Sequence, residues 1–111
     1  MKQLLIGAFL ALIVTTSLFC EYVENTPFVT VEEAKKLQDD TWVRLKGVIF
    51  KKLSKDEYSF HDSTGVITIE IDEEYFRNIT VISTDVVMIE GEVDTEMFKQ
   101  PKIDVKVIKH Y

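Results

Sequence analysis

Two runs of alternating residues, joined by a short turn, constrain this chain more than any other feature of its sequence. Residues 57–71 read EYSFHDSTGVITIEI, with apolar side chains at every second position on both sides of the turn at residues 62–65. Alternation with a period of two is typical of half-buried β-strands, and a short turn containing glycine joins such strands into a hairpin. We therefore expect an antiparallel hairpin in which an aromatic strand and an aliphatic strand share one buried face.

The first twenty residues differ from the rest of the chain in composition. Lys2 gives a positive start, residues 4–14 form an apolar run, and residues 15–17 supply small side chains. This three-part pattern is typical of a secretory signal peptide, and the apolar run is shorter than a membrane-spanning helix requires. We expect a signal peptide over residues 1–20 and a single domain over residues 21–111.

Two positions for signal cleavage compete. Cleavage after Ser17 places small residues where the peptidase requires them, whereas cleavage after Cys20 places Leu18 there. Cys20 also suggests lipoprotein processing, but that normally needs a small residue before the cysteine, and Phe19 is large. An uncleaved anchor is a further alternative. We expect export to the periplasm without lipidation of Cys20.

The charge of the mature domain bears on its partners. Removing Lys2 from the 13 basic residues leaves 12 against 19 acidic ones, a net charge of −7. An acidic domain repels phosphate backbones, so we expect no nucleic-acid partner. Cys20 is the only cysteine, so the domain is expected to contain no disulfide and no cysteine metal site.

The segments around the hairpin predict three more strands and two short helices. Thr30 and Glu33 form a capping box at the start of a helix over residues 31–37. Gly47 interrupts a long β-rich segment over residues 41–53, and such a glycine marks a bulge or a bend at the corner of a barrel. The remaining elements are a short helix over residues 72–78 and strands over residues 86–93 and 103–107.

This order of elements predicts an all-β fold with small α content. Five strands, with one helix in front and another between strands three and four, fit the five-stranded Greek-key barrel called the OB-fold. Its first strand is long, bent and shared between both halves of the barrel, which suits Gly47. An SH3-like barrel and a small sandwich are the alternatives, and the helix after the third strand favours the OB-fold.

Four segments also support a family resemblance. They read TVEEAKKLQDDTWVRLKGVI, YSFHDSTGVITIEID, VMIEGEVD and IDVKVI, and they span most of residues 28–109. In order and spacing they resemble the bacterial OB-fold (BOF) family of the YgiW/YdeI type. The resemblance implies a small periplasmic protein linked to tolerance of envelope stress, with no established enzymatic activity. His61 departs from the family, whose members more often have Arg or Lys there, which weakens any contact with an anion at neutral pH.

The period of the hairpin divides its residues between core and solvent. We expect the barrel core to contain Tyr58, Phe60, Ile67, Ile69 and Ile71. The alternate positions would face solvent beside the outer face of the long first strand, and together they form the predicted ligand groove. Its residues are Arg44, Lys46, Ser59, His61, Thr68 and Glu70, rimmed by Lys52, Lys55 and Phe98 in the two loops that flank an OB-fold groove.

Three carboxylates alternate along the fourth predicted strand. Glu90, Glu92 and Asp94 share one face, and clustered oxygens of this kind bind calcium or cationic peptides. They also lie on the strand that pairs with the first strand, where Arg44 and Lys46 offer partners of opposite charge. We favour cross-strand pairing over a cation site.

No catalytic or metal site can be assembled from this sequence. His61 and His110 are the only histidines, and neither has a nucleophile or a ligand set at suitable spacing. We expect a non-enzymatic binding module without a cofactor. Its ligand would be a small envelope-derived molecule such as a peptidoglycan fragment, a cationic peptide or a protein partner. The alternative is a single-stranded nucleic-acid-binding module that stacks bases on Tyr58 and Phe60.

Overall fold

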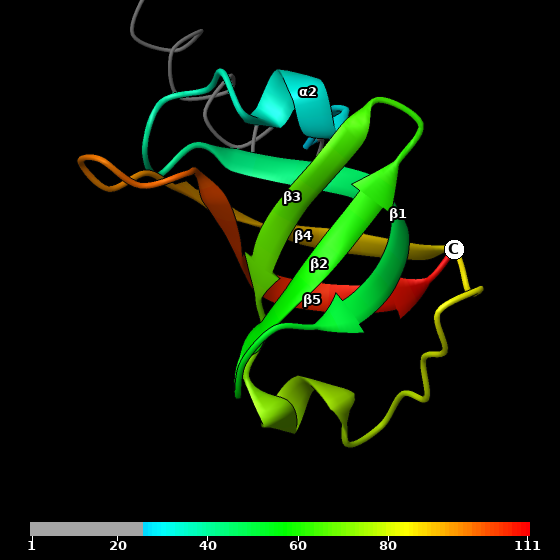
Figure 1. Cartoon of the computed structure of the whole chain (residues 1–111). Helices are drawn as coiled ribbons and strands as arrows, with labels where there is room; N and C mark the ends of the chain where they lie inside the picture. Colours follow the sequence, from blue (N-terminus) through cyan, green and yellow to red (C-terminus); the bar gives the residue numbers. More distant parts are fainter. Residues whose placement is uncertain (1–25) are drawn as a thin grey trace, which may run out of the picture.

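Five strands close into a barrel in which the first strand is shared between two halves (Figure 1). The computed structural model describes residues 26–111, and the predicted signal peptide lies outside these residues. Every strand pair is antiparallel except β3 with β5, and the order around the barrel is β1-β2-β3-β5-β4. The strands are β1 (Trp42–Lys52), β2 (Glu57–Asp62), β3 (Gly65–Glu70), β4 (Val87–Asp94) and β5 (Lys102–His110). The predicted five-stranded OB-fold barrel is confirmed.

The apolar side chains at alternate positions of the strands fill the barrel interior. In β4, for example, every second residue from Val87 to Val93 is buried, while the residues between them are half-buried. Burial of such side chains stabilises the fold by roughly 1.5–3 kcal/mol each. The largest fully buried side chains are Phe60, Leu45, Ile69, Ile71, Ile89, Ile103, Val31, Val43, Val87, Val93 and Val105. Tyr58 is only half-buried, and it packs against this core from the side.

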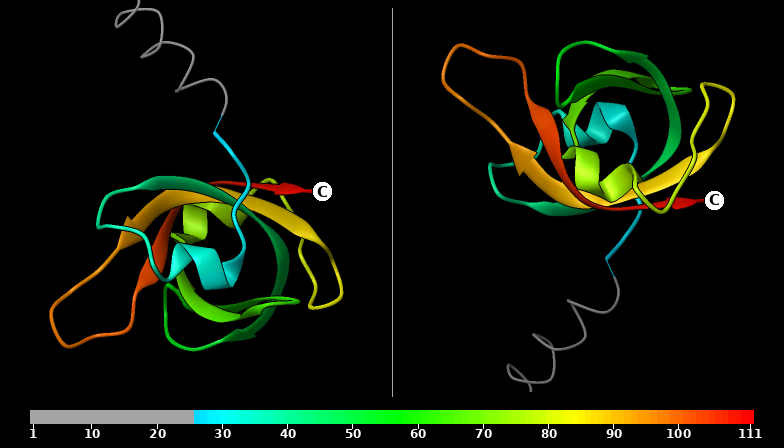
Figure 2. Two further views of the ribbon diagram at one scale, coloured as in Figure 1. Left: turned by 90° about the horizontal axis from the view of Figure 1, so that it is seen from above. Right: turned by 90° about the horizontal axis from the view of Figure 1, so that it is seen from below.

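Two short helices close opposite ends of the barrel (Figure 2). They are the α-helix α2 (Val31–Ala34) and the 3₁₀-helix η1 (Glu73–Phe76). The predicted helix over residues 31–37 is too long. Its continuation tightens into turns, because the amide of Leu37 donates to the carbonyl of Ala34, three residues back. Within residues 26–111, no helix has the length and apolar character that crossing a membrane requires.

The predicted capping box at the start of α2 is present. The amide of Glu33 donates to the hydroxyl of Thr30 at 3.1 Å, and the amide of Thr30 donates to the Glu33 carboxylate at 2.8 Å. These two bonds satisfy backbone donors that have no partner within the helix.

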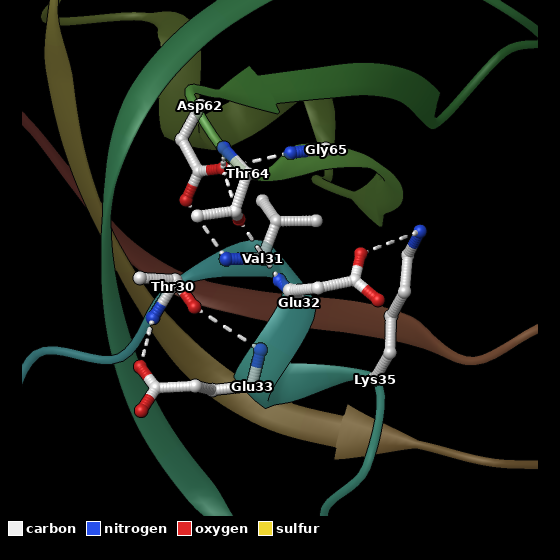
Figure 3. A network of polar contacts seen from close by, with 8 residues as sticks. All are labelled: Thr30, Val31, Glu32, Glu33, Lys35, Asp62, Thr64 and Gly65. Carbon is white, nitrogen blue, oxygen red and sulfur yellow. Dashed lines mark hydrogen bonds and ion pairs between the residues drawn. The ribbon is translucent and has the colours of Figure 1, made fainter.

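The turn between β2 and β3 supplies the remaining caps (Figure 3). Oδ2 of Asp62 accepts from the amide of Val31 at 2.8 Å, and the Thr64 hydroxyl accepts from the amide of Glu32 at 3.1 Å. Oδ1 of Asp62 accepts from the Thr64 amide, the Thr64 hydroxyl and the Gly65 amide. One carboxylate therefore shapes the hairpin turn and fixes α2 over the end of the barrel.

Gly47 is the point at which β1 changes partner. Residues up to Gly47 pair with β4, and residues from Val48 onwards pair with β2. A Cβ atom at Gly47 would overlap the carbonyl oxygen of His61 and lie 2.8 Å from the ring of Phe60. The predicted bend is thus confirmed, whereas the bulge falls later in β1, at Phe50.

We predict that Gly47→Ala destabilises the fold by about 1–3 kcal/mol, because the added methyl group collides with backbone that cannot move without breaking the β1–β2 pairing. Urea unfolding at neutral pH measures the change. Gly65→Ala is the matched control, because its nearest contact is the flexible end of Glu32 at 3.1 Å. Equal stability of the two variants would contradict the close approach at Gly47.

We predict that Asp62→Asn also destabilises the fold at neutral pH, by about 1–3 kcal/mol, because hydrogen bonds to a charged group are lost. Partial burial raises the pKa of Asp62, but bonds from Thr64, Val31 and Gly65 more than offset this and lower it overall. The stabilisation is therefore present above the ordinary aspartate pKa and lost as the pH falls through the lowered value.

The difference between wild type and Asp62→Asn in urea unfolding should accordingly shrink as the pH falls below the ordinary aspartate pKa. Asp72→Asn is the control, because Asp72 precedes η1 without making a side-chain capping bond. A difference that stays constant with pH would argue against an ionised Asp62 as the source of the stabilisation.

Candidate functional site

A cavity of about 190 Å³ lies between the loop after β1 and the loop between β4 and β5. In OB-folds these two loops flank the ligand groove. The cavity, called the acidic groove below, is lined by Leu53, Glu57, Thr68, Asp94, Glu96, Lys99, Gln100 and Lys102. Its walls come from β2, β3, β4 and β5, so the closure of the barrel brings them together.

Lys102 occupies the centre of the charge network in the acidic groove. Its ammonium group lies 2.9 Å from Oε1 of Glu70 and 3.4 Å from Oε2 of Glu57. The hydrogen bond to Glu70 raises the pKa of Lys102 well above its ordinary value, against the opposite effect of partial burial. Glu57 and Glu70 face each other across the hairpin, and Lys102 compensates their repulsion.

Asp94 has a different environment in the same groove. It forms no ion pair within residues 26–111. Burial raises its pKa above the ordinary aspartate value; Lys102 opposes the rise, and the nearby charges of Glu96 and Asp39 add to it. An ionised Asp94 is therefore a carboxylate whose charge is poorly compensated by its surroundings.

The residues predicted for one groove do not lie together. Thr68 lines the acidic groove, and Glu70 reaches it through Lys102. On the rim, Lys55 is exposed and Phe98 is 99% exposed with a positive φ of 65°. Lys52 instead lies over the ring of Tyr58, at 5.8 Å from the ring centre.

Ser59 does not face solvent as predicted. It is only 9% exposed, and its hydroxyl has no hydrogen-bond partner in the part of the chain that the structure describes. Ser59 pairs with Lys51 of β1 on one side and with Thr68 of β3 on the other, and both partners have longer side chains than serine. The prediction failed because alternation indicates which face of the sheet a side chain lies on, but not how far its surroundings on that face shield it from solvent.

The predicted pairing of charges between β1 and β4 is half right. Glu90 accepts from Nε of Arg44 at 3.2 Å and from the indole N–H of Trp42 at 2.6 Å. Lys46, however, lies opposite Met88 and has no carboxylate partner there. The guanidinium group of Arg44 is thus paired with Glu90 on the barrel wall, whereas the ammonium group of Lys46 has no carboxylate partner across β4.

Lys46 and His61 line a second and larger cavity of about 670 Å³, called the apolar pocket below. It is distinct from the acidic groove, because no residue lines both cavities. Its walls include Phe28 before α2, Val48 of β1, Val86 before β4, and Tyr111 after β5. His61 packs against Phe50, with ring centres 5.0 Å apart.

Glu57 and Lys102 were missed in the prediction of the groove. The register of the hairpin could have indicated them, because it places Glu57 opposite Glu70. Two like charges at opposed positions are destabilising unless a cation lies nearby. What no local pattern indicates is that Lys102 of β5 supplies it, since β3 and β5 are parallel and distant in sequence.

Comparison with known proteins agrees with the fold. Residues 20–110 match the family model for the bacterial OB fold (BOF) protein. The chain belongs to this family. It is 45% identical to Protein YgiW of Escherichia coli K12 over 85 residues, which are 77% of this chain and 65% of YgiW. The match thus spans slightly less than two thirds of that relative's length.

Other relatives and solved structures are consistent with this membership. The calcium-regulated OB-fold protein CarO of Pseudomonas aeruginosa is 38% identical over 80 residues, covering 72% of this chain and 68% of CarO. A structure of E. coli YgiW aligns with a TM-score of 0.74 at 44% identity, covering 77% of this chain and 90% of that one. The telomere capping protein Ten1 of Saccharomyces pombe aligns with a TM-score of 0.61 at 12% identity, covering 78% of this chain and 81% of that one; this likeness concerns the fold alone.

We predict that Lys102→Gln lowers the free energy of unfolding at neutral pH by about 1 kcal/mol, because it leaves Glu57 and Glu70 opposed without a cation. The raised pKa of Lys102 means that its stabilisation is present below the ordinary lysine pKa and lost only as the pH rises through the higher folded value.

Urea unfolding at pH 7 of Lys102→Gln and of Lys106→Gln tests this role. Lys106 also forms an ion pair, with Asp104 at 3.2 Å, but both side chains are more exposed, so its loss should cost less. If Lys106→Gln lowers the free energy of unfolding as much as Lys102→Gln does, the charge network around Lys102 contributes no more to stability than an exposed ion pair.

Proposed function

We propose that this protein is an exported, non-enzymatic binding module that binds cationic peptide segments in its acidic groove under envelope stress. The observation that carries the proposal is Asp94, a carboxylate without an ion-pair partner among the described residues, in the groove where OB-folds bind ligands. The role in envelope stress rests on the family resemblance, and export rests on the signal-peptide pattern of residues 1–20.

The charges around the acidic groove favour a cation. Four carboxylates surround it, and only two ammonium groups, those of Lys99 and Lys102, offset them. Both ammonium groups are already paired, Lys99 with Glu96 and Lys102 with Glu70. The four carboxylates belong to Glu57, Glu70, Asp94 and Glu96. An incoming lysine or arginine side chain would therefore meet a net negative field.

Apolar side chains on the groove's rim suit a peptide better than a bare metal ion. Leu53, Met97 and Phe98 are all exposed, and they extend from the two loops that flank the groove. Large exposed side chains of this kind bind the apolar parts of a ligand whose charge is held elsewhere. A cationic peptide offers both groups.

The chemistry of Asp94 gives the proposal an energetic argument. Its raised pKa means that holding it ionised at neutral pH lowers the stability of the fold. A bound cation would relieve that cost, since an opposite charge at close range favours the ionised carboxylate. Sites that sacrifice stability in this way are typical of binding surfaces.

Binding of single-stranded nucleic acid is the less favoured function. Phe60 is completely buried, and the half-buried Tyr58 packs against Phe76 with ring centres 5.5 Å apart, so neither ring offers a free stacking face. The acidic groove would also repel a phosphate backbone.

Titration of the labelled protein with a lysine- and arginine-rich peptide, followed by NMR, tests the proposal. We expect shifts around the acidic groove that weaken with salt. Asp94→Asn should weaken peptide binding about fivefold, which corresponds to the loss of one partly exposed ion pair. The same substitution should raise the melting temperature, because it removes a poorly compensated charge. A lower affinity together with a higher melting temperature would show that Asp94 serves binding, because loss of a structural residue would lower the melting temperature.

Glu73→Gln combined with Glu74→Gln is the control, because these exposed residues of η1 lie outside the groove and their removal changes the net charge in the same direction. Calcium and a peptidoglycan fragment are titrated in parallel. The proposal is wrong if the peptide leaves the groove signals unchanged, or if the control variant weakens binding as much as Asp94→Asn does.

A further inference from the structure

The apolar pocket lies outside the acidic groove, and the proposed function makes no use of it. It is assembled from both termini of the described chain, with Phe28 and Tyr111 forming an aromatic wall whose ring centres are 6.2 Å apart at an angle of 84°. Its volume of about 670 Å³ falls within the range of small-molecule sites. The acidic groove, at about 190 Å³, is much smaller.

Backbone hydrogen bonds hold the aromatic wall in place. The chain beside Phe28 is tied to β1, because the amide of Val29 donates to the carbonyl of Arg44 at 2.8 Å. The amide of Tyr111 donates to the carbonyl of Val86 at 3.0 Å. Phe28 is 49% exposed and Tyr111 68% exposed, so both rings keep apolar surface open to solvent, and the guanidinium group of Arg44 lies 5.4 Å from the centre of the Phe28 ring. Preformed apolar surface of this kind lowers the cost of binding a ligand.

The acidic side chains of the apolar pocket are already engaged. Asp62 accepts four hydrogen bonds, including those from Val31 and Gly65, and Glu33 accepts one from the amide of Thr30 (Figure 3). Both carboxylates therefore serve α2 and the hairpin turn. Their bonding leaves them poor partners for a ligand cation.

The basic side chain of the pocket has no such partner. Lys46 is exposed and forms no ion pair among residues 26–111, and its ammonium group lies 4.5 Å from the centre of the Tyr111 ring. His61 adds an imidazole to the same wall. The pocket thus combines aromatic surface with a cation that lies over the Tyr111 ring and has no carboxylate partner among the described residues.

We infer that the apolar pocket is a second binding site, for a small organic anion with a flat apolar body and a single carboxylate. The body would lie against Phe28 and Tyr111, and the carboxylate would meet the ammonium group of Lys46. This ligand is opposite in charge to the peptide proposed for the acidic groove. The two sites share no lining residue, so each can be tested without the other.

Titration with naphthalene-2-carboxylate, followed by NMR on the labelled protein, tests the inference. We expect shifts at Phe28, Lys46, Val86 and Tyr111, and none at residues of the acidic groove. The neutral 2-naphthalenemethanol should bind less tightly, and 2-naphthylmethylammonium least tightly, because only the carboxylate gains from Lys46.

Two variants assign the parts of the site. Lys46→Gln should weaken binding of the carboxylate about fivefold while leaving binding of the neutral alcohol unchanged, because the alcohol forms no ion pair with Lys46. Tyr111→Ala should weaken both probes, because it removes an aromatic face that both contact. Lys36→Gln is the matched control, since Lys36 is exposed and lies outside the pocket.

Three results would overturn the inference. The first is an absence of shifts at the pocket up to the solubility limit of the carboxylate. The second is equal binding of all three probes with no effect of Lys46→Gln, which would indicate binding by hydrophobic contact alone. The third is self-association in sedimentation that Tyr111→Ala abolishes, which would assign the aromatic wall to a second copy of the chain.

Discussion

The close approach of backbone at Gly47 is the constraint on which the barrel depends. Here β1 leaves β4 and joins β2, and a side chain would meet the carbonyl of His61 and the ring of Phe60. Because the long first strand serves both halves, five strands are enough to enclose a core. Gly91 plays a related part in β4, where an added Cβ atom would overlap the carbonyl of Asp104 and where the pairing with β5 shifts register.

The same bend determines where the two candidate sites lie. Residues of β1 next to Gly47 enter the apolar pocket, whereas the loop that follows β1 reaches the acidic groove through Leu53. Asp62 then fixes α2 beside the apolar pocket by accepting a hydrogen bond from the amide of Val31, the first residue of the helix. The barrel therefore carries two surfaces of unlike chemistry. One has net negative charge and contains Asp94, which has no ion-pair partner among the described residues, and the other combines aromatic surface with Lys46.

Much of the fold could be predicted from the sequence, because its determinants are local. The hairpin alternation, the capping box at Thr30 and the glycine in β1 each act on near neighbours, and each predicted an element that the structure contains. The length of α2 was overestimated, because the apolar period continues to Leu37, which packs on the core without being helical.

The candidate site was predicted less well, because its determinants are not local. Lys46 and Thr68 share a predicted face, yet they line different cavities once the barrel curves. Ser59 is buried at a position where the alternation predicted exposure, and Lys102 reaches Glu70 only through the parallel pairing of β3 and β5. Strand period determines the side of a sheet, and only the curvature and closure of the barrel determine which side chains meet.

That parallel pairing is the seam of the barrel. It is short, with three register pairs from Thr68 to Glu70 on one strand and from Lys102 to Asp104 on the other. The acidic groove lies across it, since Thr68 belongs to one side and Lys102 to the other. A molecule bound there would contact both sides, so it would be released when the seam opens and would hold the seam shut while bound. Binding of the proposed ligand in the groove would therefore be coupled to local opening of the barrel at the place where the chain closes on itself.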